Sequence, residues 1–310
     1  FGPLIDGEQL NRLQARAERG REDLVILDLS DGTADDPMAT HKAGHIPGAR
    51  FVNWREEINQ FPFPILTEGS AGALQVPVRR VLQAKLRDLG VNRRSRVVLY
   101  DNFRNRAAIR AMFVMEYFGK ARRVHILEGG VAAYTAADGA LDTCGWPADC
   151  PQAERRGRIR LRRANTAMTI DFDGRGDAPG IRDLVSSPRE GTTIIDARPY
   201  SMFIGDRIGG CIHPSEPVYR RGHMPGALAR PWPDNESAPG YFKPTHELAE
   251  LYTNIDDYGD EEIVLYCNEG LHAVYDWFVL TKLLGYPKHL LKVYEGSIGE
   301  YSRQSFKPGV

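Results

Sequence analysis

Short apolar runs alternate with amphipathic segments along the whole chain. Residues 97–99 and 263–265 consist of valine, isoleucine and leucine, the composition of a strand that is buried on both faces of a parallel sheet. Residues 76–89, 106–118 and 274–284 instead carry apolar side chains at helical spacing. This alternation predicts an α/β fold, in which a mainly parallel sheet is covered by helices on both faces.

The second half of the chain repeats the first. Both halves contain, in the same order, a strand that ends in Asp, a Gly-His-x-Pro-Gly-Ala turn, a second strand that ends in Tyr-Asp or Tyr-Cys, and a Glu-Gly pair. These patterns stand at Asp28 and Asp196, at 44–49 and 222–227, at Asp101 and Cys267, and at 128–129 and 295–296. The shared order predicts two similar domains in tandem.

The length of the chain agrees with this repeat, because 310 residues suit two domains of about 150 residues, each able to bury its own core. Between 139 and 158, Gly, Pro, Cys and charged residues replace periodic apolar ones. We therefore predict a first domain at 1–140, a linker at 141–160 and a second domain at 161–310.

Cys144 and Cys150 lie in the predicted linker, and the chain has 4 cysteines in all. Free, exposed thiols are the default expectation, and a disulfide that closes a short loop is the alternative for an exported protein. The chain begins with Phe1 rather than Met. Together with the two linker cysteines this favours a periplasmic location, with a cytoplasmic one as the alternative. Cys211 is assigned no chemistry.

The overall charge is close to neutral, with 40 basic and 41 acidic residues. Nothing in this balance calls for a nucleic acid or membrane partner, so any charge preference must be local. The apolar stretch 109–118 is interrupted by Arg110 and Glu116 and is too short to span a membrane.

Cys267 is the strongest candidate for chemistry. It follows the apolar run 263–265 and precedes a helical pattern, so it opens a strand-to-helix loop. Backbone N–H groups of such a loop and the N-terminus of the following helix favour a thiolate, which predicts a lowered pKa for Cys267 and a nucleophilic role. Gly270 suits the tight curvature that such a loop needs.

These patterns resemble the rhodanese family of sulfurtransferases in its tandem, two-domain form, and the resemblance spans nearly the whole chain. It implies two rhodanese-like domains and an active-site loop that begins at Cys267. In the first domain Asp101 takes the place of the cysteine. Because a carboxylate cannot carry a sulfane sulfur, the resemblance implies that the first domain is inactive.

The resemblance also implies a two-step sulfur relay. Cys267 takes a sulfane sulfur from thiosulfate or a related donor, holds it as a persulfide and passes it to cyanide, a small thiol or a protein thiol. The expected partners are thus a small sulfur donor and acceptor, and no cofactor or metal is expected. Backbone amides of the loop would cradle the anion, and the loop residues expected to contact substrate are Asn268, Glu269, Gly270, Leu271, His272 and Ala273.

Three alternatives stay open beside the thiosulfate reading. In the first alternative the donor is 3-mercaptopyruvate. In the second the protein is a persulfide carrier without turnover, and in the third the loop belongs to a phosphatase. Family members that use thiosulfate often place basic residues after the cysteine, and those that use mercaptopyruvate often read Cys-Gly-Ser-Gly. Asn268 and Glu269 match neither pattern. The phosphatase reading is disfavoured, because such loops are longer and end in Arg.

Side chains outside the immediate loop complete the predicted site. Arg198 and Arg221 are the candidates to bind an anionic donor, and the alternative for Arg198 is a buried ion pair with a loop. Glu269 is expected to face water, because its carboxylate would repel the thiolate. His272 is either a proton donor or a solvated loop residue.

Other conspicuous residues receive structural interpretations. Asp196 is expected to bond backbone amides or an arginine. His45 and His223 belong to turns present in both halves and are expected to stabilise them, since metal binding would need further ligands that the sequence does not reveal. Trp232, Tyr275 and Trp277 either line the site or belong to the core. Arg104 and Arg106 face a cleft between the domains or lie on the surface.

Overall fold

The computed structural model describes residues 1–59, 74–145, 148–209, 220–253, 255 and 262–304. It divides into two compact units. The first holds the described residues of 1–61, 76–165 and 238–241, and the second holds those of 62–75, 166–237 and 242–310. Cys211 lies outside the described residues.

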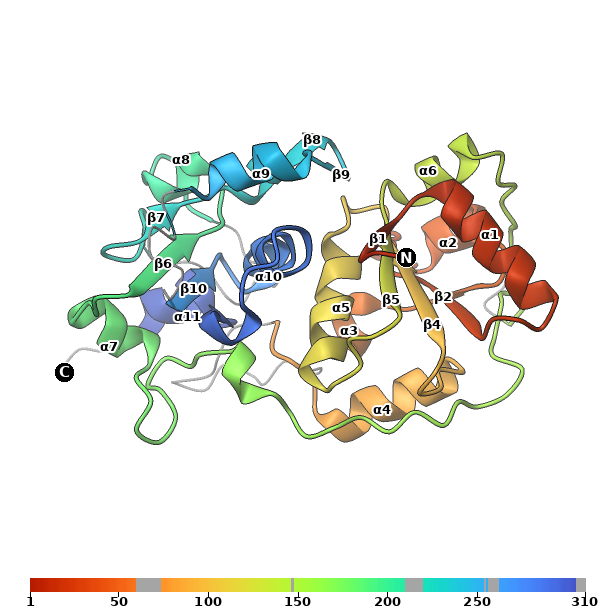
Figure 1. Cartoon of the computed structure of the whole chain (residues 1–310), viewed down its shortest axis with the longest axis horizontal. Helices are drawn as coiled ribbons and strands as arrows, with labels where there is room; N and C mark the ends of the chain where they lie inside the picture. The colour runs from red at the N-terminus through yellow and green to blue at the C-terminus, as the bar shows by residue number, and fades with distance from the viewer. Residues whose placement is uncertain (60–73, 146–147, 210–219, 254, 256–261, 305–310) are drawn as a thin grey trace. The chain divides into compact units, whose positions relative to one another are not determined.

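The first unit is built on a five-stranded parallel sheet with the order β1-β5-β4-β2-β3 (Figure 1). Its strands are β1 (Leu4–Ile5), β2 (Leu24–Asp28), β3 (Ala49–Phe51), β4 (Arg96–Tyr100) and β5 (Val124–Leu127). Its helices are α1 (Gly7–Glu18), α2 (Ala39–Ala43), α3 (Trp54–Glu57), α4 (Arg79–Asp88), α5 (Arg106–Tyr117) and α6 (Gly130–Ala136).

The second unit repeats this plan on a four-stranded parallel sheet with the order β11-β10-β6-β7. Its strands are β6 (Thr192–Asp196), β7 (Leu228–Ala229), β10 (Glu262–Tyr266) and β11 (Leu291–Val293). The strands β8 (Glu236–Ala238) and β9 (Tyr241–Phe242) form a separate pair, of which residues 238–241 group with the first unit. The α-helices are α7 (Ile181–Ser186), α8 (Tyr200–Phe203), α9 (Thr245–Leu251), α10 (Leu271–Phe278) and α11 (Ser297–Gln304), and the segment Val279–Leu283 continues α10 as a π-helix. The predicted α/β fold and internal repeat are confirmed.

Equivalent residues meet in the same register in both sheets. Asp28 pairs with Tyr100 between β2 and β4, and Asp196 pairs with Tyr266 between β6 and β10. Each tyrosine hydroxyl accepts a hydrogen bond from the backbone of the Gly-His turn: Ile46 N donates to Tyr100 over 3.3 Å, and Met224 N donates to Tyr266 over 3.0 Å. The central strand of each unit therefore fixes the turn that the sequence repeats.

The apolar stretch at 109–118 is buried in the first unit. All of α5 from Ala107 to Tyr117 is buried. Arg110 within it is fully buried, and its Nε donates to Asn59 Oδ1 over 2.9 Å. Among the described residues, no helix is both long and apolar enough to span a bilayer.

The segment predicted as a linker is packed onto the first unit, which differs from the predicted boundaries. Gly157 N donates to Arg87 O over 2.7 Å, and Ile159 N donates to Val91 O over 3.2 Å. Cys144 and Cys150 are buried and joined by a disulfide, so the expectation of free, exposed thiols is wrong. The composition of the segment did not indicate this packing, because the apolar residue Ile159 lies between charged neighbours.

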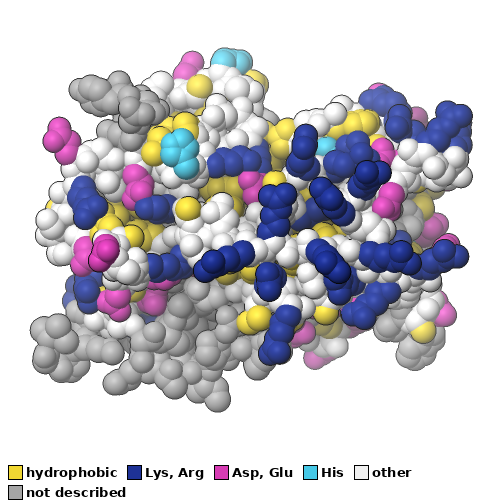
Figure 2. All heavy atoms as spheres, turned by 60° about the horizontal axis from the view of Figure 1, so that its bottom comes forward, with side chains coloured by type: hydrophobic (Ala, Val, Ile, Leu, Met, Phe, Trp, Pro, Cys, Tyr) yellow, Lys and Arg dark blue, Asp and Glu magenta, His cyan; other side chains and the backbone are white. Residues whose placement is uncertain are grey.

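Basic side chains gather on part of the surface although the chain is nearly neutral, and Figure 2 shows a face on which Lys and Arg are frequent. In the first unit Arg158, Arg160 and Arg162 are exposed, whereas Ile159 and Leu161 between them are buried. A groove of ≈ 410 Å³ in this unit is lined by Arg87, Arg156, Gly157, Arg158 and Arg160. Positive charge is thus concentrated locally, although the chain as a whole is nearly neutral.

Candidate active site

Cys267 lies at the carboxyl end of the central strand β10, directly before the loop that leads into α10. Ligands in open parallel sheets bind at this end of the strands. The side chain is 1% exposed, and its Sγ accepts a hydrogen bond from Gly270 N over 3.1 Å. Gly270 has φ +94°, in the left-handed region that favours glycine, and this turns the chain so that its N–H faces the sulfur. The predicted strand-to-helix position of the cysteine is confirmed.

Burial is the dominant influence on the thiol. It raises the pKa of Cys267, and the carboxylate of Glu269 raises it as well, while backbone N–H groups of Ala273, Glu269 and His272 lower it without cancelling the rise. The prediction of a lowered pKa is therefore wrong for Cys267 when it carries no sulfane sulfur. The predicted stabilising groups are present, since the backbone amides do point at the sulfur. The sequence does not show, however, that the thiol is buried.

Glu269 is buried, with 4% of its surface exposed, so the expectation that it faces water is wrong. Its charge acts directly on Cys267. A carboxylate this close disfavours a second anion in the loop. The loop therefore holds opposing elements: amides that stabilise a sulfur anion and a side chain that destabilises it.

The remaining loop residues have different surroundings. Leu271 and Ala273 are buried in the first turn of α10. Asn268 is buried too, and its Nδ2 lies 3.9 Å from Met202 Sδ. His272 is partly exposed and stacks on Trp232 with ring centroids 4.9 Å apart. The ring of His272 is thus held by an aromatic contact rather than freely solvated.

Arg198 is 1% exposed and forms a buried ion pair. Its Nε donates to Asp196 Oδ1 over 2.9 Å, and its Nη2 donates to Asp196 Oδ2 over 2.6 Å and to Gly222 O over 2.7 Å. Burial lowers the pKa of Arg198, but Asp196 raises it more, and the charge of Cys267 also acts to raise it. Arg198 therefore ties the end of β6 to the Gly-His turn and at the same time places positive charge near the sulfur. The predicted bond between Asp196 and an arginine is confirmed.

Arg221 is exposed, and its Nη1 donates to Gly205 O over 3.1 Å and to Asp206 O over 2.7 Å. It holds the loop that follows α8. Binding of a donor by Arg198 or Arg221 stays a prediction.

The histidines of the two turns have different surroundings. His223 is exposed, contacts Phe203 O over 2.9 Å and stacks on the Phe203 ring with centroids 3.8 Å apart. His45 is buried and contacts His41 O over 2.8 Å. Both contacts fix the turn, as predicted. The aromatic residues Trp232, Tyr275 and Trp277 are all buried, in agreement with the core interpretation.

Ser297 was not predicted from the sequence, yet it holds Cys267 in place. Its Oγ accepts a hydrogen bond from Cys267 N over 3.0 Å and donates one to Tyr294 O over 2.8 Å. Ser297 is fully buried and has φ +54°. The signal that points to it is the repeated Glu-Gly pair, since Ser297 follows the second copy directly.

In the first unit the buried carboxylate of Asp101 occupies the position equivalent to Cys267, at the end of β4 and before α5. Arg106 lies with its guanidinium 3.3 Å from the Phe103 ring centroid and donates through Nε to Phe103 O over 2.9 Å. The first unit therefore has the loop without the cysteine.

A cysteine enclosed by backbone amides at the end of a central parallel strand defines a protein that holds an anion or a covalent intermediate on sulfur. The model of the rhodanese-like domain matches residues 10–137 and 182–304, and the chain belongs to this family. The two matches contain the two copies of the repeat, as the repeat predicts.

Curated relatives are similar over most of the chain. A probable 3-mercaptopyruvate sulfurtransferase of Pseudomonas aeruginosa is 29% identical over 98% of this chain and 98% of its own length. The putative thiosulfate sulfurtransferase SseA of Mycobacterium bovis is 29% identical over 92% of this chain and 84% of its own. The sulfur carrier protein TtuD of Thermus thermophilus is 28% identical over 86% and 85%.

Solved structures share the fold. The 3-mercaptopyruvate sulfurtransferase SseA of Escherichia coli superposes with a TM-score of 0.71 at 24% identity, over 96% of this chain and 99% of that chain. The Tum1 protein of Saccharomyces cerevisiae superposes with a TM-score of 0.75 at 17% identity, over 98% and 96%.

Proposed function

We propose that this protein is a sulfurtransferase that takes the outer sulfur of thiosulfate or a related sulfane donor onto Cys267 and passes it to a thiophilic acceptor. The observation that carries the proposal is the sulfur of Cys267, enclosed at the end of β10 with backbone N–H groups directed at it. Such an arrangement stabilises a negative charge on sulfur both before and after the transfer.

The reaction divides into two exchanges at sulfur. The thiolate of Cys267 attacks the outer sulfur of thiosulfate, the sulfur–sulfur bond of the donor breaks, and sulfite leaves with the electron pair. The new Cys267 persulfide carries the negative charge on its outer sulfur, within reach of the loop amides. Cyanide then attacks this outer sulfur, leaves as thiocyanate and restores the thiolate. Neither exchange needs a proton donor in the loop.

A second candidate donor is 3-mercaptopyruvate, and the relative from Pseudomonas aeruginosa that aligns over 98% of the chain favours it. With this donor the leaving group is the enolate of pyruvate, which takes up a proton. His272, held against Trp232, is the group in the loop that can supply it. A third candidate, a persulfide carrier that exchanges sulfur only with partner proteins, is favoured by the similarity to the carrier TtuD.

Steady-state kinetics with cyanide as acceptor distinguish these candidates. We expect a higher kcat/KM with thiosulfate than with 3-mercaptopyruvate, and no turnover in Cys267→Ser with either donor. A ratio of the two kcat/KM values in favour of 3-mercaptopyruvate would assign the second donor. A persulfide that forms on Cys267 without turnover of either donor would assign the carrier role. Turnover that persists in Cys267→Ser would exclude all three.

We also propose that the protein works in an oxidising compartment, the periplasm. The disulfide between Cys144 and Cys150 supports this, because such bonds persist where thiols are not kept reduced. Alkylation of thiols in intact cells, followed by mass analysis without reduction, is the test. Cys144 and Cys150 should escape alkylation, and alkylation of both in the intact cells would favour the cytoplasm.

A further inference from the structure

The segment 151–163 of the first unit carries a row of arginines that the sulfur chemistry does not use. Gly157, Ile159 and Leu161 in it are buried, whereas the residues that alternate with them are exposed: Arg158, Arg160 and Arg162. In an extended segment alternate side chains lie on the same face, about 6.5 Å apart. These three side chains, the arginine row, therefore leave the protein on the side away from its core.

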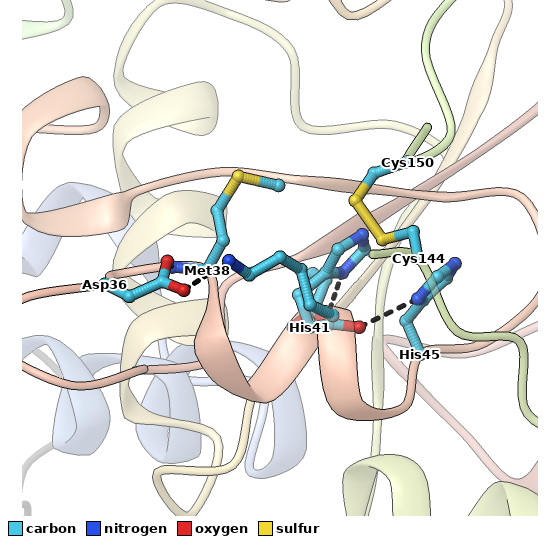
Figure 3. Close-up of a disulfide and its surroundings, with 8 residues drawn as sticks. Asp36, Met38, His41, His45, Cys144 and Cys150 are labelled. Atoms are coloured by element: carbon cyan, nitrogen blue, oxygen red, sulfur yellow. Dashed lines mark hydrogen bonds and ion pairs between the residues drawn. A yellow bond between two sulfur atoms is a disulfide. The ribbon is translucent and has the colours of Figure 1, made fainter. Parts of the chain in front are cut away.

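The segment that carries the arginine row is fixed to the first unit. Leu161 N donates to Gln83 Oε1 over 2.9 Å, and Arg87 Nε donates to Ile159 O over 2.9 Å, so the segment packs along α4. The disulfide at Cys150 holds the chain directly before the segment (Figure 3). The backbone of the row is thus in place before any partner binds, which lowers the entropy cost of binding.

Further exposed arginines extend the row on the surface of the same unit. Two lie at the start of α4, and two lie beside Asn92, whose Oδ1 accepts a hydrogen bond from Arg158 N over 2.9 Å. Figure 2 turns the α4 side of Figure 1 forward and shows how frequent Lys and Arg are there. We call the following set the basic face: Arg79, Arg80, Arg93, Arg94, Arg158, Arg160, Arg162 and Arg163. Among the residues that the structure describes, none of them forms an ion pair.

The groove of ≈ 410 Å³ lies within the basic face, since Arg158 and Arg160 are part of its lining. Arg156, which also lines it, is paired with Asp88 over 2.7 Å. The guanidinium groups of Arg158 and Arg160 keep their charge for a partner. Because a guanidinium can bind a phosphate through two parallel hydrogen bonds, the groove is suited to a phosphate group, and the row beside it is suited to several more.

Exposed apolar side chains lie next to the arginines of α4. Val78 is 50% exposed and Val81 is 52% exposed, and they flank Arg79 and Arg80 in the sequence. Residues 154–163 contain no aromatic residue on which the bases of a single-stranded nucleic acid could stack. Arginines beside exposed apolar groups instead favour the interface of an anionic bilayer, where the charges meet headgroups and the apolar groups reach the edge of the acyl chains.

We propose that the basic face binds the surface of a membrane that contains anionic phospholipids. Headgroup phosphates contact the arginine row, and Val78 and Val81 enter the interface beside them. The attachment is peripheral, because no helix among the described residues is long and apolar enough to span a bilayer. The nearly neutral charge of the whole chain does not oppose it, because at about 0.1 M salt the attraction extends only about 10 Å, so that the charge of the nearest face decides.

Flotation of the full chain with lipid vesicles in a density gradient tests the proposal. One batch of vesicles contains equal parts of phosphatidylglycerol and phosphatidylcholine, and the other contains phosphatidylcholine alone. We expect the protein to float with the anionic vesicles only, and to lose most of this binding when the salt concentration rises from about 0.05 M to about 0.5 M. Equal binding to both batches, or binding that salt does not weaken, would overturn the proposal.

A triple variant tests whether the arginine row makes the contact. The change Arg158→Gln with Arg160→Gln and Arg162→Gln should weaken binding to the anionic vesicles by about 100-fold, since each basic residue near such a surface contributes about five-fold. All three positions are exposed, so thermal unfolding should be unaltered. An undiminished affinity in the folded variant would overturn the proposal.

A matched control separates the row from the net charge. The change Arg12→Gln with Arg182→Gln and Arg189→Gln removes the same charge from exposed positions outside the basic face and should leave binding nearly unchanged. If the two triple variants lose affinity equally, net charge and not this face causes the binding. The change Val78→Ser with Val81→Ser should weaken binding a few-fold at high salt as well as at low salt, because the apolar contribution is not screened.

Competition distinguishes the membrane from other anions. Free glycerol phosphate should not release the protein from the vesicles beyond the effect of sodium sulfate at the same ionic strength; if it does, the groove binds a single free phosphate. Duplex DNA and polyglutamate should bind more weakly than the vesicles at the same concentration of negative charge. Tighter binding of either would assign the basic face to a nucleic acid or to an acidic protein and would overturn the proposal.

Discussion

The loops after β4 and β10 use the same backbone device for different ends. In the first unit the carboxylate of Asp101 accepts hydrogen bonds from Phe103 N at 2.6 Å, Asn105 N at 2.9 Å and Ala108 N at 2.8 Å. In the second unit the sulfur of Cys267 accepts from Gly270 N at 3.1 Å. A loop whose amides converge on one point can hold either a fixed carboxylate or a reactive sulfur, and the first residue of the loop decides which.

The comparison extends to the backbone around the loops. Asn105 and Gly270 both precede a helix and both have positive φ, 62° and 94°. Gly130 and Ser297 also correspond, with φ of 55° and 54°. The two units therefore keep the same unusual backbone positions although the side chains differ. The difference teaches that the same backbone geometry can direct its amides either at a carboxylate or at a sulfur.

The largest expected effect concerns Asp101, whose pKa is raised to about 6, chiefly by burial, from a usual value of 3.8. The folded protein then holds a proton that the unfolded chain has lost. Stability from this group is full below about pH 4 and falls as the pH rises through 6, by a total of about 3 kcal/mol. Asp101→Asn should remove this part of the pH dependence. Urea denaturation of both proteins across this range measures it.

The exposed Asp35 provides the control, since Asp35→Asn should leave the pH dependence as it is. If Asp101→Asn and the parent protein lose stability equally between about pH 4 and pH 7, the carboxylate does not carry the buried charge that the comparison assigns to it.

Gly270 provides the next test, because it shapes the reactive loop. A Cβ added there would lie 3.1 Å from Glu295 O in a backbone conformation that L side chains rarely adopt. Gly270→Ala should move the sulfur relative to the amides and lower the rate of sulfur transfer on the order of 100-fold. Gly285 has φ +75° with no atom within 4 Å of an added Cβ, so Gly285→Ala carries the same backbone strain away from the loop. Equal losses in both variants would mean that strain alone, and not the position of the sulfur, sets the rate.

The smallest of these effects concerns Glu269. Its carboxylate raises the pKa of Cys267, so Glu269→Gln should shift the pH–rate profile of sulfur loading toward lower pH. At pH 7 loading should become several-fold faster, and the gain should be larger for the doubly charged thiosulfate than for singly charged 3-mercaptopyruvate. Glu247→Gln, on an exposed position of α9, should change neither. An unshifted profile in Glu269→Gln would remove Glu269 from the electrostatics of the loop.

The sequence was sufficient to predict the fold and the position of Cys267 between a strand and a helix. Apolar strands keep a simple pattern, and the repeat doubled every signal: Asp28 and Asp196 do end equivalent strands, and Asp101 and Cys267 do open equivalent loops. Such patterns can be read from the sequence because the spacing of apolar residues within one strand or one helix is local.

The surroundings of the site were not predictable in the same way. A glutamate in a loop normally faces water, so nothing in the sequence indicated that Glu269 is buried beside the sulfur. The pairing of Cys144 with Cys150, and the approach of His41 to Cys144, depend on how the segment after α6 returns to α2. Contacts of this kind are set by tertiary packing between distant parts of the chain, which spacing along the sequence does not encode.

The most direct test of the central claim is the mass of the intact protein after exposure to a sulfur donor, followed by peptide mapping. We predict the addition of a single sulfur atom, located on the peptide that contains Cys267, removed by cyanide and absent in Cys267→Ser. The first unit should gain none, because Asp101 fills the equivalent position. Sulfur that loads onto another cysteine and is cleared by cyanide at the same rate, or loading that persists in Cys267→Ser, would contradict the account.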